Sequence, residues 1–182
     1  MIIGLTGKNG SGKGQVAERL KDCGFLYVSL SDVLREEAVR RKLALTRENL
    51  YALGNRLRSE HGAGYLAGQV LAKIDPGKPH VIDSIRHPEE VVRLRKASGF
   101  VFVAVEASPE IRFARMLERA REKDPKTWEE FRRLESREAE SGNEADQQLD
   151  KTLKLADYTV QNGGSLQQLE DNIRNLLKKI QK

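Results

Sequence analysis

The sequence predicts an α/β fold in which helices cover a parallel sheet, and two features support this. Short β-rich runs alternate with longer helical patterns along the 182 residues, which is typical of strands joined by helical crossovers. The first apolar run also leads directly into a glycine-rich segment and then into a helical pattern. The length fits one domain, which we expect to span residues 1–182.

The expected elements follow one another in regular order. The runs that predict strands cover residues 1–6, 25–30, 80–83, 100–107 and 158–161. The helical patterns cover about residues 13–22, 32–42, 47–71, 89–96, 109–121 and 166–180. Residues 122–150 are almost wholly polar and lie between two strand-bearing parts. We interpret them either as a solvent-facing helical pair or as a lid over a ligand, and their position favours the lid.

Composition excludes several classes of protein. With 38% hydrophobic residues, the chain has no apolar stretch near the roughly 20 residues that cross a bilayer, and we expect neither a membrane partner nor a signal peptide. Only 5% of residues are aromatic and the net charge of +5 is spread out, so we expect no specific nucleic-acid partner. The single cysteine, Cys23, fits a reducing compartment, and we expect a cytoplasmic protein whose Cys23 packs in the core.

The strongest motif is G-K-N-G-S-G-K-G at residues 7–14, between a strand and a helix. Its glycines let backbone N–H groups converge on phosphate, and Lys13 can reach the β- and γ-phosphates, so we predict an ATP site. The residues expected to bind ATP are Lys8, Asn9, Gly10, Ser11, Gly12, Lys13, Gly14 and Gln15. Gly14 and Gln15 stand where a Ser or Thr usually binds Mg²⁺. We therefore expect phosphates, waters and a carboxylate to hold this ion.

Candidate residues for the second substrate follow two other strands. Asp32 and Arg35 lie three residues apart at the start of the second helix, near one face. The spacing of Ser29 and Asp32 equally fits a helix cap. Asp83 ends the third strand, either as a carboxylate that organises Mg²⁺ or as a cap of the following turn. Arg86 follows at the mouth of the same expected cleft.

Arginines also mark the fifth expected helix and the polar segment. Arg112, Arg115 and Arg119 share one helix face, and we expect at least one of them to be simply solvated. The opposite apolar face, which we expect to pack on the sheet, consists of Phe113, Met116, Leu117 and Ala120. Arg133 and Arg137 lie one turn apart in the polar segment, where Trp128 either covers a ligand or anchors that segment. The residues expected to have surface or structural roles, because they lack metal-site spacing, are His61, His80 and His87.

These motifs resemble those of P-loop kinases related to adenylate and dephospho-coenzyme A kinases. The stretch S-L-S-D-V-L-R resembles a segment whose arginine holds the acceptor phosphate, and Arg35 takes that place. Arg86 stands one residue before the usual position of a second such arginine. The stretch I-R-F-A-R-M-L-E-R resembles the start of the dephospho-coenzyme A kinase lid, which implies that Arg115 and Arg119 approach the ATP phosphates. Such kinases carry further lid arginines where Arg133 and Arg137 stand, which implies that Arg137 closes with the lid.

The end of the chain extends the resemblance. The segment A-D-Y-T-V-Q-N-G-G-S-L is similar to the ending of dephospho-coenzyme A kinases, which implies that Asn162 lies beside the adenine. The phrases S-L-S-D-V-L-R-E-E, V-I-D-S-I-R-H-P-E-E-V and Q-Q-L-D resemble the kinase-like domain fused to some deoxycytidylate deaminases. A functional link to a deaminase is therefore one expectation, although the chain itself has no P-C-x-x-C zinc signature.

Together these features predict a three-layer P-loop NTPase fold of the nucleoside monophosphate kinase type. The acceptor region is expected at about residues 32–71 and the lid at about 112–150. The expected reaction is phosphoryl transfer from ATP, with Mg²⁺, to a nucleoside or deoxynucleoside monophosphate. One alternative is phosphorylation of a hydroxyl, as in dephospho-coenzyme A, with Asp32 as general base. The other is a nucleotide sensor that regulates a partner protein.

Overall fold

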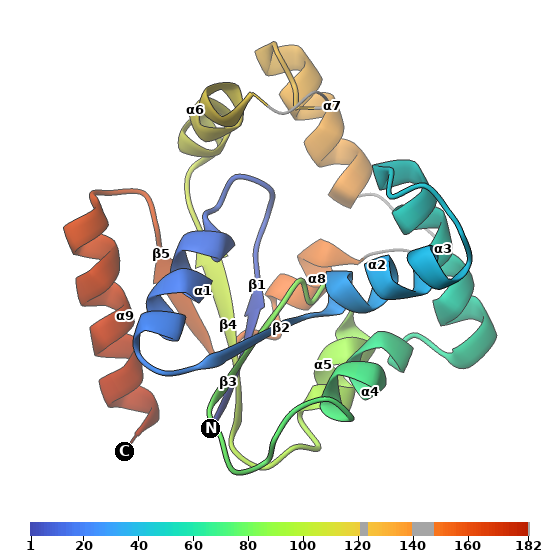
Figure 1. Ribbon diagram of the computed structural model, residues 1–182. Helices are drawn as coiled ribbons and strands as arrows, with labels where there is room; N and C mark the ends of the chain where they lie inside the picture. The colour runs from blue at the N-terminus through green and yellow to red at the C-terminus, as the bar shows by residue number, and fades with distance from the viewer. Residues whose placement is uncertain (121–123, 140–147, 182) are drawn as a thin grey trace.

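The computed structural model describes residues 1–120, 124–139 and 148–181. At its centre lies a five-stranded parallel sheet in the order β2-β3-β1-β4-β5, with helices on both faces (Figure 1). The strands are β1 (Ile2–Thr6), β2 (Leu26–Ser29), β3 (His80–Asp83), β4 (Phe100–Glu106) and β5 (Tyr158–Gln161). The helices are α1 (Lys13–Asp22), α2 (Leu30–Arg40), α3 (Arg47–His61), α4 (Tyr65–Leu71), α5 (Pro88–Leu94), α6 (Pro109–Arg119), α7 (Trp128–Ala139), α8 (Leu149–Leu153) and α9 (Leu166–Ile180). The expected three-layer α/β fold is confirmed, and each expected strand is present.

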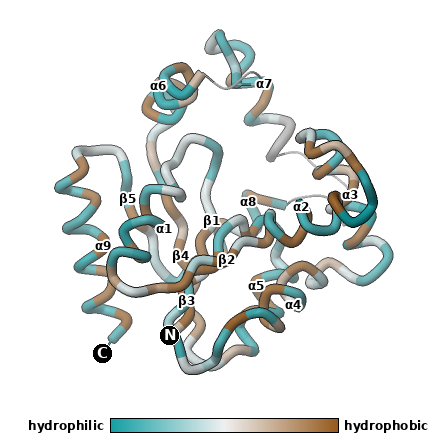
Figure 2. Tube along the Cα trace, viewed as in Figure 1, coloured by the Kyte–Doolittle hydropathy of each residue, from teal (hydrophilic) through white to brown (hydrophobic). Residues whose placement is uncertain are grey.

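Successive residues of the central strands face opposite sides of the sheet, and helices cover both sides. On β1, Ile2 packs with α2, α3, α4 and α5, whereas Ile3 and Leu5 pack with α1 and α9. On β4, Phe102 belongs to the cluster with α2, α3, α4 and α5, and Val103 belongs to the cluster with α1 and α9. Figure 2 shows hydrophobic positions along the strands and on the flanking helices. Because neither face of these strands meets water, they read as unbroken apolar runs in the sequence.

The register brings the carboxyl ends of the strands to one edge of the sheet. Thr6 of β1 lies opposite Ala104 of β4, and Ser29 of β2 lies opposite Asp83 of β3. The Thr6 hydroxyl donates to the Ile85 carbonyl at 2.9 Å, which ties the loop after β3 to the end of β1. Ligands of open α/β sheets bind at this edge. The segments that follow β1, β2 and β3 are therefore neighbours.

The single helix expected over about residues 47–71 is wrong, because the structure has two helices there, α3 and α4. Gly62 ends α3 with a φ of 91°, and its N–H donates to the Arg58 carbonyl at 2.8 Å. Glycine adopts such a positive φ at little steric cost. The chain therefore leaves the helix at Gly62 and begins the next one at Tyr65.

The start of α2 also differs from the expectation, since the helix begins at Leu30 rather than near Asp32. Ser29 caps this helix by accepting a hydrogen bond from the Ser31 N–H at 3.1 Å. The Asp32 carboxylate pairs with Arg35 instead of closing a capping box with Ser29. The N-cap of α2 is therefore Ser29 alone, and Asp32 is paired with Arg35 in its first turn.

The apolar face of α6 does not pack on the sheet, contrary to the expectation. Phe113 lies against Trp128 and Phe131 of α7, with ring centroids 5.4 and 5.5 Å apart. Trp128 also stacks on Phe131 within α7 at 5.1 Å, and the contacts of both rings with Phe113 anchor α7 to α6. Leu117 is 45% exposed. Helices α6 and α7 form a separate unit above the carboxyl edge of the sheet (Figure 1).

Cys23 is exposed, so the expectation that it packs in the core is wrong. Its backbone N–H ends α1 by donating to the Arg19 and Leu20 carbonyls.

Within the described residues, no helix combines the length and the hydropathy that a membrane crossing requires.

Candidate active site

The glycine-rich segment forms a tight loop between β1 and α1. Gly10 and Gly12 have φ angles of 78° and 87°. A Cβ at Gly10 would lie 2.6 Å from the Arg112 carbonyl oxygen, and one at Gly12 would lie 2.0 Å from Nδ2 of Asn162. Side chains at these two positions would therefore meet both strain and collision. We call residues 7–14 the phosphate loop.

Lys13 folds back over the phosphate loop. Its Nζ donates to the Gly7 carbonyl at 2.6 Å and lies 3.4 Å from that of Lys8. The Ser11 side chain is 1% exposed, and its Oγ has no hydrogen-bond partner in the described part of the chain. A lysine ammonium and an unsatisfied buried hydroxyl, in a glycine-rich loop that leads into a helix, fit a loop that a phosphate chain completes. Gly14 follows in the first turn of α1, with open space around it.

Asn162 and Arg115 hold the phosphate loop from outside. Asn162, which is 3% exposed, donates from Nδ2 to the Ser11 carbonyl at 2.9 Å and to Oε1 of Gln15 at 3.1 Å. The Arg115 guanidinium lies 3.4 Å from the carbonyls of Gly10 and Ser11 and 3.4 Å from Oδ1 of Asn162. Three residues singled out from the sequence, Gln15, Arg115 and Asn162, thus meet at the loop.

Arg112 is a residue whose importance the sequence did not reveal. It is 4% exposed, pairs with Glu135 of α7 and lies 5.3 Å above the Phe131 ring. Its guanidinium also donates to the Ala107 carbonyl at 3.1 Å and lies 3.5 Å from that of Asn9. Arg112 therefore joins α7 to the end of β4 and to the phosphate loop. In the sequence, the feature that could have pointed to Arg112 was its position in the first turn of the helix after the fourth strand.

The other arginines predicted for the lid belong to the end of α6 and to α7. Arg119 pairs with Asp124, with nitrogen–oxygen distances of 2.6 and 2.8 Å, at the far end of α6. Arg133 is exposed on α7. The side chain of Arg137 lies outside the described residues.

Asp83 is the last residue of β3, which pairs with β1, the strand that leads into the phosphate loop. One carboxylate oxygen accepts the Ser84 N–H at 2.6 Å, and the other accepts the Tyr27 hydroxyl at 3.3 Å. Burial, together with the negative charges of Asp83 and then Asp32, raises the pKa of Tyr27 to about 12. A tyrosine phenol is already protonated at neutral pH, and this raised pKa keeps it a hydrogen-bond donor into the alkaline range as well.

The first turn of α2, directly after β2, carries an ion pair between Asp32 and Arg35. NH1 of Arg35 lies 2.6 Å from Oδ1 of Asp32, and both side chains are half-exposed. Asp32 is thus open to solvent and held in place by Arg35. This arrangement leaves both residues available to a bound molecule.

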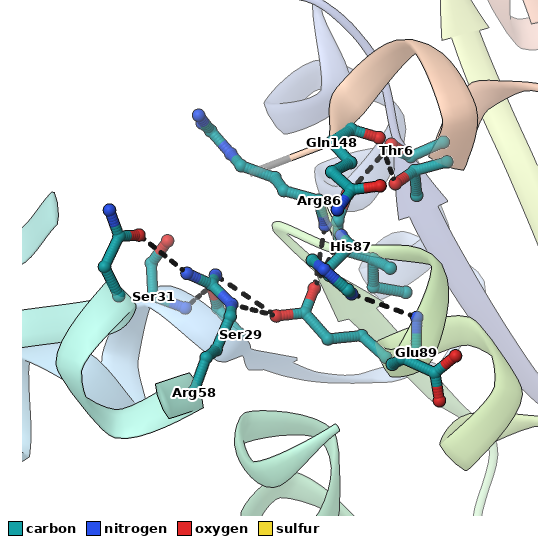
Figure 3. A network of polar contacts seen from close by, with 12 residues as sticks. Thr6, Ser29, Ser31, Arg58, Arg86, His87, Glu89 and Gln148 are labelled. Atoms are coloured by element: carbon teal, nitrogen blue, oxygen red, sulfur yellow. Dashed lines mark hydrogen bonds and ion pairs between the residues drawn. The ribbon is translucent and has the colours of Figure 1, made fainter. Parts of the chain in front are cut away.

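A buried carboxylate sets the path of the loop that carries Arg86. Glu90 is fully buried, and its Oε2 accepts the N–H groups of Arg86 and His87 at 2.9 and 3.1 Å. Its Oε1 lies 3.3 Å from the guanidinium of Arg58, itself 5% exposed, so α3 is joined to this loop (Figure 3). On the other side, the Gln148 N–H donates to the Arg86 carbonyl at 3.0 Å. The sequence did not point to Arg58 or Glu90.

The three histidines have the surface or structural roles expected of them. His87 is buried and caps α5, with Nδ1 accepting the Glu89 N–H at 3.1 Å. His80 is buried within β3, and His61 is half-exposed beside Tyr65.

The end of the polar segment also returns to the site. Asp150 of α8 lies 3.5 Å from Nζ of Lys8 in the phosphate loop. A cavity of about 410 Å³ opens beside that lysine, between the loop and the ends of β4 and β5. The residues that line it are Lys8, Ser11, Val105, Glu106, Ala107, Ser108, Arg112, Leu153 and Gln161.

Asp83 is the carboxylate best placed to contribute to a Mg²⁺ site that a nucleotide would complete. Across residues 1–120, 124–139 and 148–181, no three His, Cys, Asp or Glu side chains are grouped to bind a metal. Asp83 is the carboxylate at the end of the strand next to β1. Mg²⁺ commonly binds through one or two carboxylates together with substrate phosphates and waters. Asp83 fits that single-carboxylate role.

Comparison with known proteins gives both a family and a fold. Residues 3–150 match the family described as an AAA domain. The UPF0200 protein of Thermococcus gammatolerans is 36% identical, and the match covers 99% of this chain and 95% of that protein. A UPF0200/UPF0201 protein of Archaeoglobus fulgidus is 37% identical over 100% of this chain but only 56% of its own length.

Solved structures share the architecture at low sequence identity. Shikimate kinase from Bacteroides thetaiotaomicron has a TM-score of 0.64 at 14% identity, covering 100% of this chain and 99% of that one. The TT1252 protein from Thermus thermophilus has a TM-score of 0.57 at 24% identity, covering 98% and 97%. These likenesses establish the fold.

Proposed function

The chain belongs to the UPF0200 family and carries an AAA domain with the P-loop kinase fold. On that premise we propose that it transfers the γ-phosphoryl group of ATP, with Mg²⁺, to a nucleoside or deoxynucleoside monophosphate. One observation carries the proposal. The phosphate loop, the Asp83–Arg86 segment and the Asp32–Arg35 segment follow β1, β3 and β2, which are adjacent strands of one sheet. The three segments therefore lie next to one another at the carboxyl edge, which supports a donor site beside an acceptor site.

The donor side rests on the phosphate loop. Its N–H groups and Lys13 would bind the phosphates of ATP, and Asp83 would hold the water shell of Mg²⁺. Mg²⁺, when bound, supplies charge neutralisation between the β- and γ-phosphates. Arg115 and Asn162 already lie against the loop, where they would support it from outside. We further propose that Asn162 lies beside the adenine of bound ATP.

The acceptor side rests on two arginines at neighbouring strand ends. Arg35 is oriented by Asp32, and the backbone of Arg86 is fixed by Glu90 and Gln148. Guanidinium groups bind phosphate through charge-assisted hydrogen bonds. A phosphate acceptor needs no strong general base, so orientation and charge neutralisation would provide most of the rate enhancement.

Phosphorylation of a hydroxyl is the second candidate, and the Asp32–Arg35 ion pair is the observation that favours it. The carboxylate of Asp32 is half-exposed and held at a strand end by Arg35 at 2.6 Å. An oriented, solvent-accessible carboxylate of this kind can accept the proton of a hydroxyl nucleophile. The relatives compared here lend no support to the expected link with a deaminase, which stays outside this proposal.

Replacing Arg35 distinguishes a phosphate acceptor from a hydroxyl acceptor. If Arg35 binds an acceptor phosphate, Arg35→Ala should raise the acceptor KM about 10- to 100-fold, the equivalent of one lost charge-assisted hydrogen bond. The dissociation constant of ATP should stay unchanged. Steady-state kinetics with varied acceptor, and calorimetry with ATP, measure the two effects.

Arg40→Ala is the matched control, because Arg40 is exposed on the same helix and pairs with Glu37. An equal loss of ATP affinity in Arg35→Ala would place Arg35 on the donor side. A much larger loss of kcat in Asp32→Asn than in Arg35→Ala would favour the hydroxyl acceptor, since the base would be missing.

We also propose that α6 and α7 act as the lid expected at about residues 112–150, part of which lies outside the described residues. The unit touches the phosphate loop through Arg112 and Arg115 and is held together by the Phe113–Trp128–Phe131 cluster. ATP together with an acceptor should slow hydrogen exchange in α7, because the closed form gains charge-assisted hydrogen bonds. Exchange in α9 should stay the same. Protection of α7 that is already strong without nucleotide, and that no nucleotide alters, would contradict a lid.

A further inference from the structure

Tyr27 joins the edge strand β2 to the carboxylate at the end of β3. Its hydroxyl donates to Oδ2 of Asp83 at 3.3 Å. In the pairing of β2 with β3, Tyr27 lies opposite Val81 and Ser29 lies opposite Asp83. The Tyr27 side chain therefore reaches along the sheet toward its carboxyl edge, and it remains 40% exposed there.

The second oxygen of Asp83 is held by the backbone. Oδ1 accepts the Ser84 N–H at 2.6 Å. Ser84 has a φ of 66°, which is uncommon for a residue other than glycine. Its hydroxyl lies 3.3 Å from that of Ser29, so β2 also supports this turn. Among the described residues, Ser84 thus donates to one oxygen of the Asp83 carboxylate from its backbone, and Tyr27 donates to the other from its side chain.

We propose that Tyr27 is a positioning residue for Asp83, which keeps the carboxylate in one orientation toward Mg²⁺ in the ATP complex. This inference rests on the proposed function. A carboxylate oxygen has about two lone pairs, so an oxygen that accepts the Tyr27 hydroxyl still has capacity for the water shell of the ion. Hydrogen bonds of this kind to metal-binding groups typically contribute 10- to 100-fold in metal affinity or activity.

The test is Tyr27→Phe, which removes the hydroxyl and keeps the ring. Mn²⁺ binding to the protein–ATP complex, followed by electron paramagnetic resonance, should weaken about 10-fold. The Mg²⁺ concentration that gives half-maximal activity should rise by a similar factor, while ATP binding in the absence of divalent metal stays unchanged. Tyr51→Phe is the control, because Tyr51 is 42% exposed on α3 and removal of its hydroxyl should alter neither measurement.

Three results would overturn the assignment. Unchanged Mn²⁺ affinity would show that the hydroxyl does not orient Asp83. Equal weakening of metal-free ATP binding would give Tyr27 a structural or nucleotide-binding role. A higher acceptor KM with unaltered Mn²⁺ binding would make it an acceptor contact. If the wild-type protein transferred no phosphoryl group, the proposed function would fail, and the Mn²⁺ titration would still decide the role of Tyr27.

Discussion

Lys13→Ala is expected to reduce phosphoryl transfer by at least about 10²–10³-fold, the range typical of losing one electrostatic contact to the transition state. Lys13 is the cation within the phosphate loop, and its Nζ already lies 2.6 Å from the Gly7 carbonyl. Without it, the β- and γ-phosphates would lose a charge-assisted hydrogen bond. Calorimetric titration with ATP and a single-turnover assay measure the loss.

The same substitution should leave the fold intact. The core residues of α1 are Val16, Ala17 and Leu20, and Lys13 lies at the start of the helix, outside that set. Its thermal unfolding curve should therefore match that of the control Lys21→Ala, an exposed residue on α1 that pairs with Glu18. ATP binding as tight as in the wild type would show that the donor site is assigned to the wrong loop.

Glu90→Ala is expected to destabilise the protein by about 3–5 kcal/mol, the usual effect of removing one partner of a buried ion pair. For a chain of this length that corresponds to a decrease in Tm of roughly 6–20 °C. The variant leaves the Arg58 guanidinium, whose side chain is 3% exposed, without its carboxylate. It also removes the acceptor of the Arg86 and His87 N–H groups.

Differential scanning calorimetry of Glu90→Ala beside Glu89→Ala measures this effect, because Glu89 is the exposed neighbour on the same helix turn. Glu90→Gln should fall between them, since its amide oxygen can still accept one of the backbone hydrogen bonds. Equal Tm values for Glu89→Ala and Glu90→Ala would refute a central role of the Arg58–Glu90 pair.

The sheet and the phosphate loop could be predicted because their signals are local. Strands buried on both faces read as apolar runs, and the loop requires glycine at Gly10 and Gly12 for reasons of backbone geometry. The break between α3 and α4 was missed, although residues 58–62 read R-S-E-H-G and include no apolar residue other than glycine. There the local glycine signal was correct and the expectation of one continuous helix was wrong.

The residues that support the site could not be predicted in the same way. Arg58 and Glu90 are 32 positions apart, and Arg112 and Glu135 are 23 apart, so only the folded chain brings them together. The structure shows a capping box at His87 and Glu90, but it explains only part of the contacts of Glu90.

The packing of α6 shows a further limit of periodicity. A helical pattern shows that a helix has an apolar face, but not what that face meets. The partners of Phe113 are Trp128 and Phe131, two aromatic residues within a segment that is otherwise polar. The contacts of these two rings with Phe113 hold α7 on α6, and other helices cover the sheet.

The most direct test of the proposed function is a transfer assay with γ-labelled ATP and Mg²⁺. The acceptors are a panel of nucleoside and deoxynucleoside monophosphates together with dephospho-coenzyme A, and Lys13→Ala serves as the blank. The proposal predicts that label appears on the phosphate of at least one monophosphate and that the blank yields none. If dephospho-coenzyme A alone became labelled, the acceptor group would be a hydroxyl rather than a phosphate. ATP binding without transfer to any acceptor would contradict a kinase and leave a nucleotide sensor.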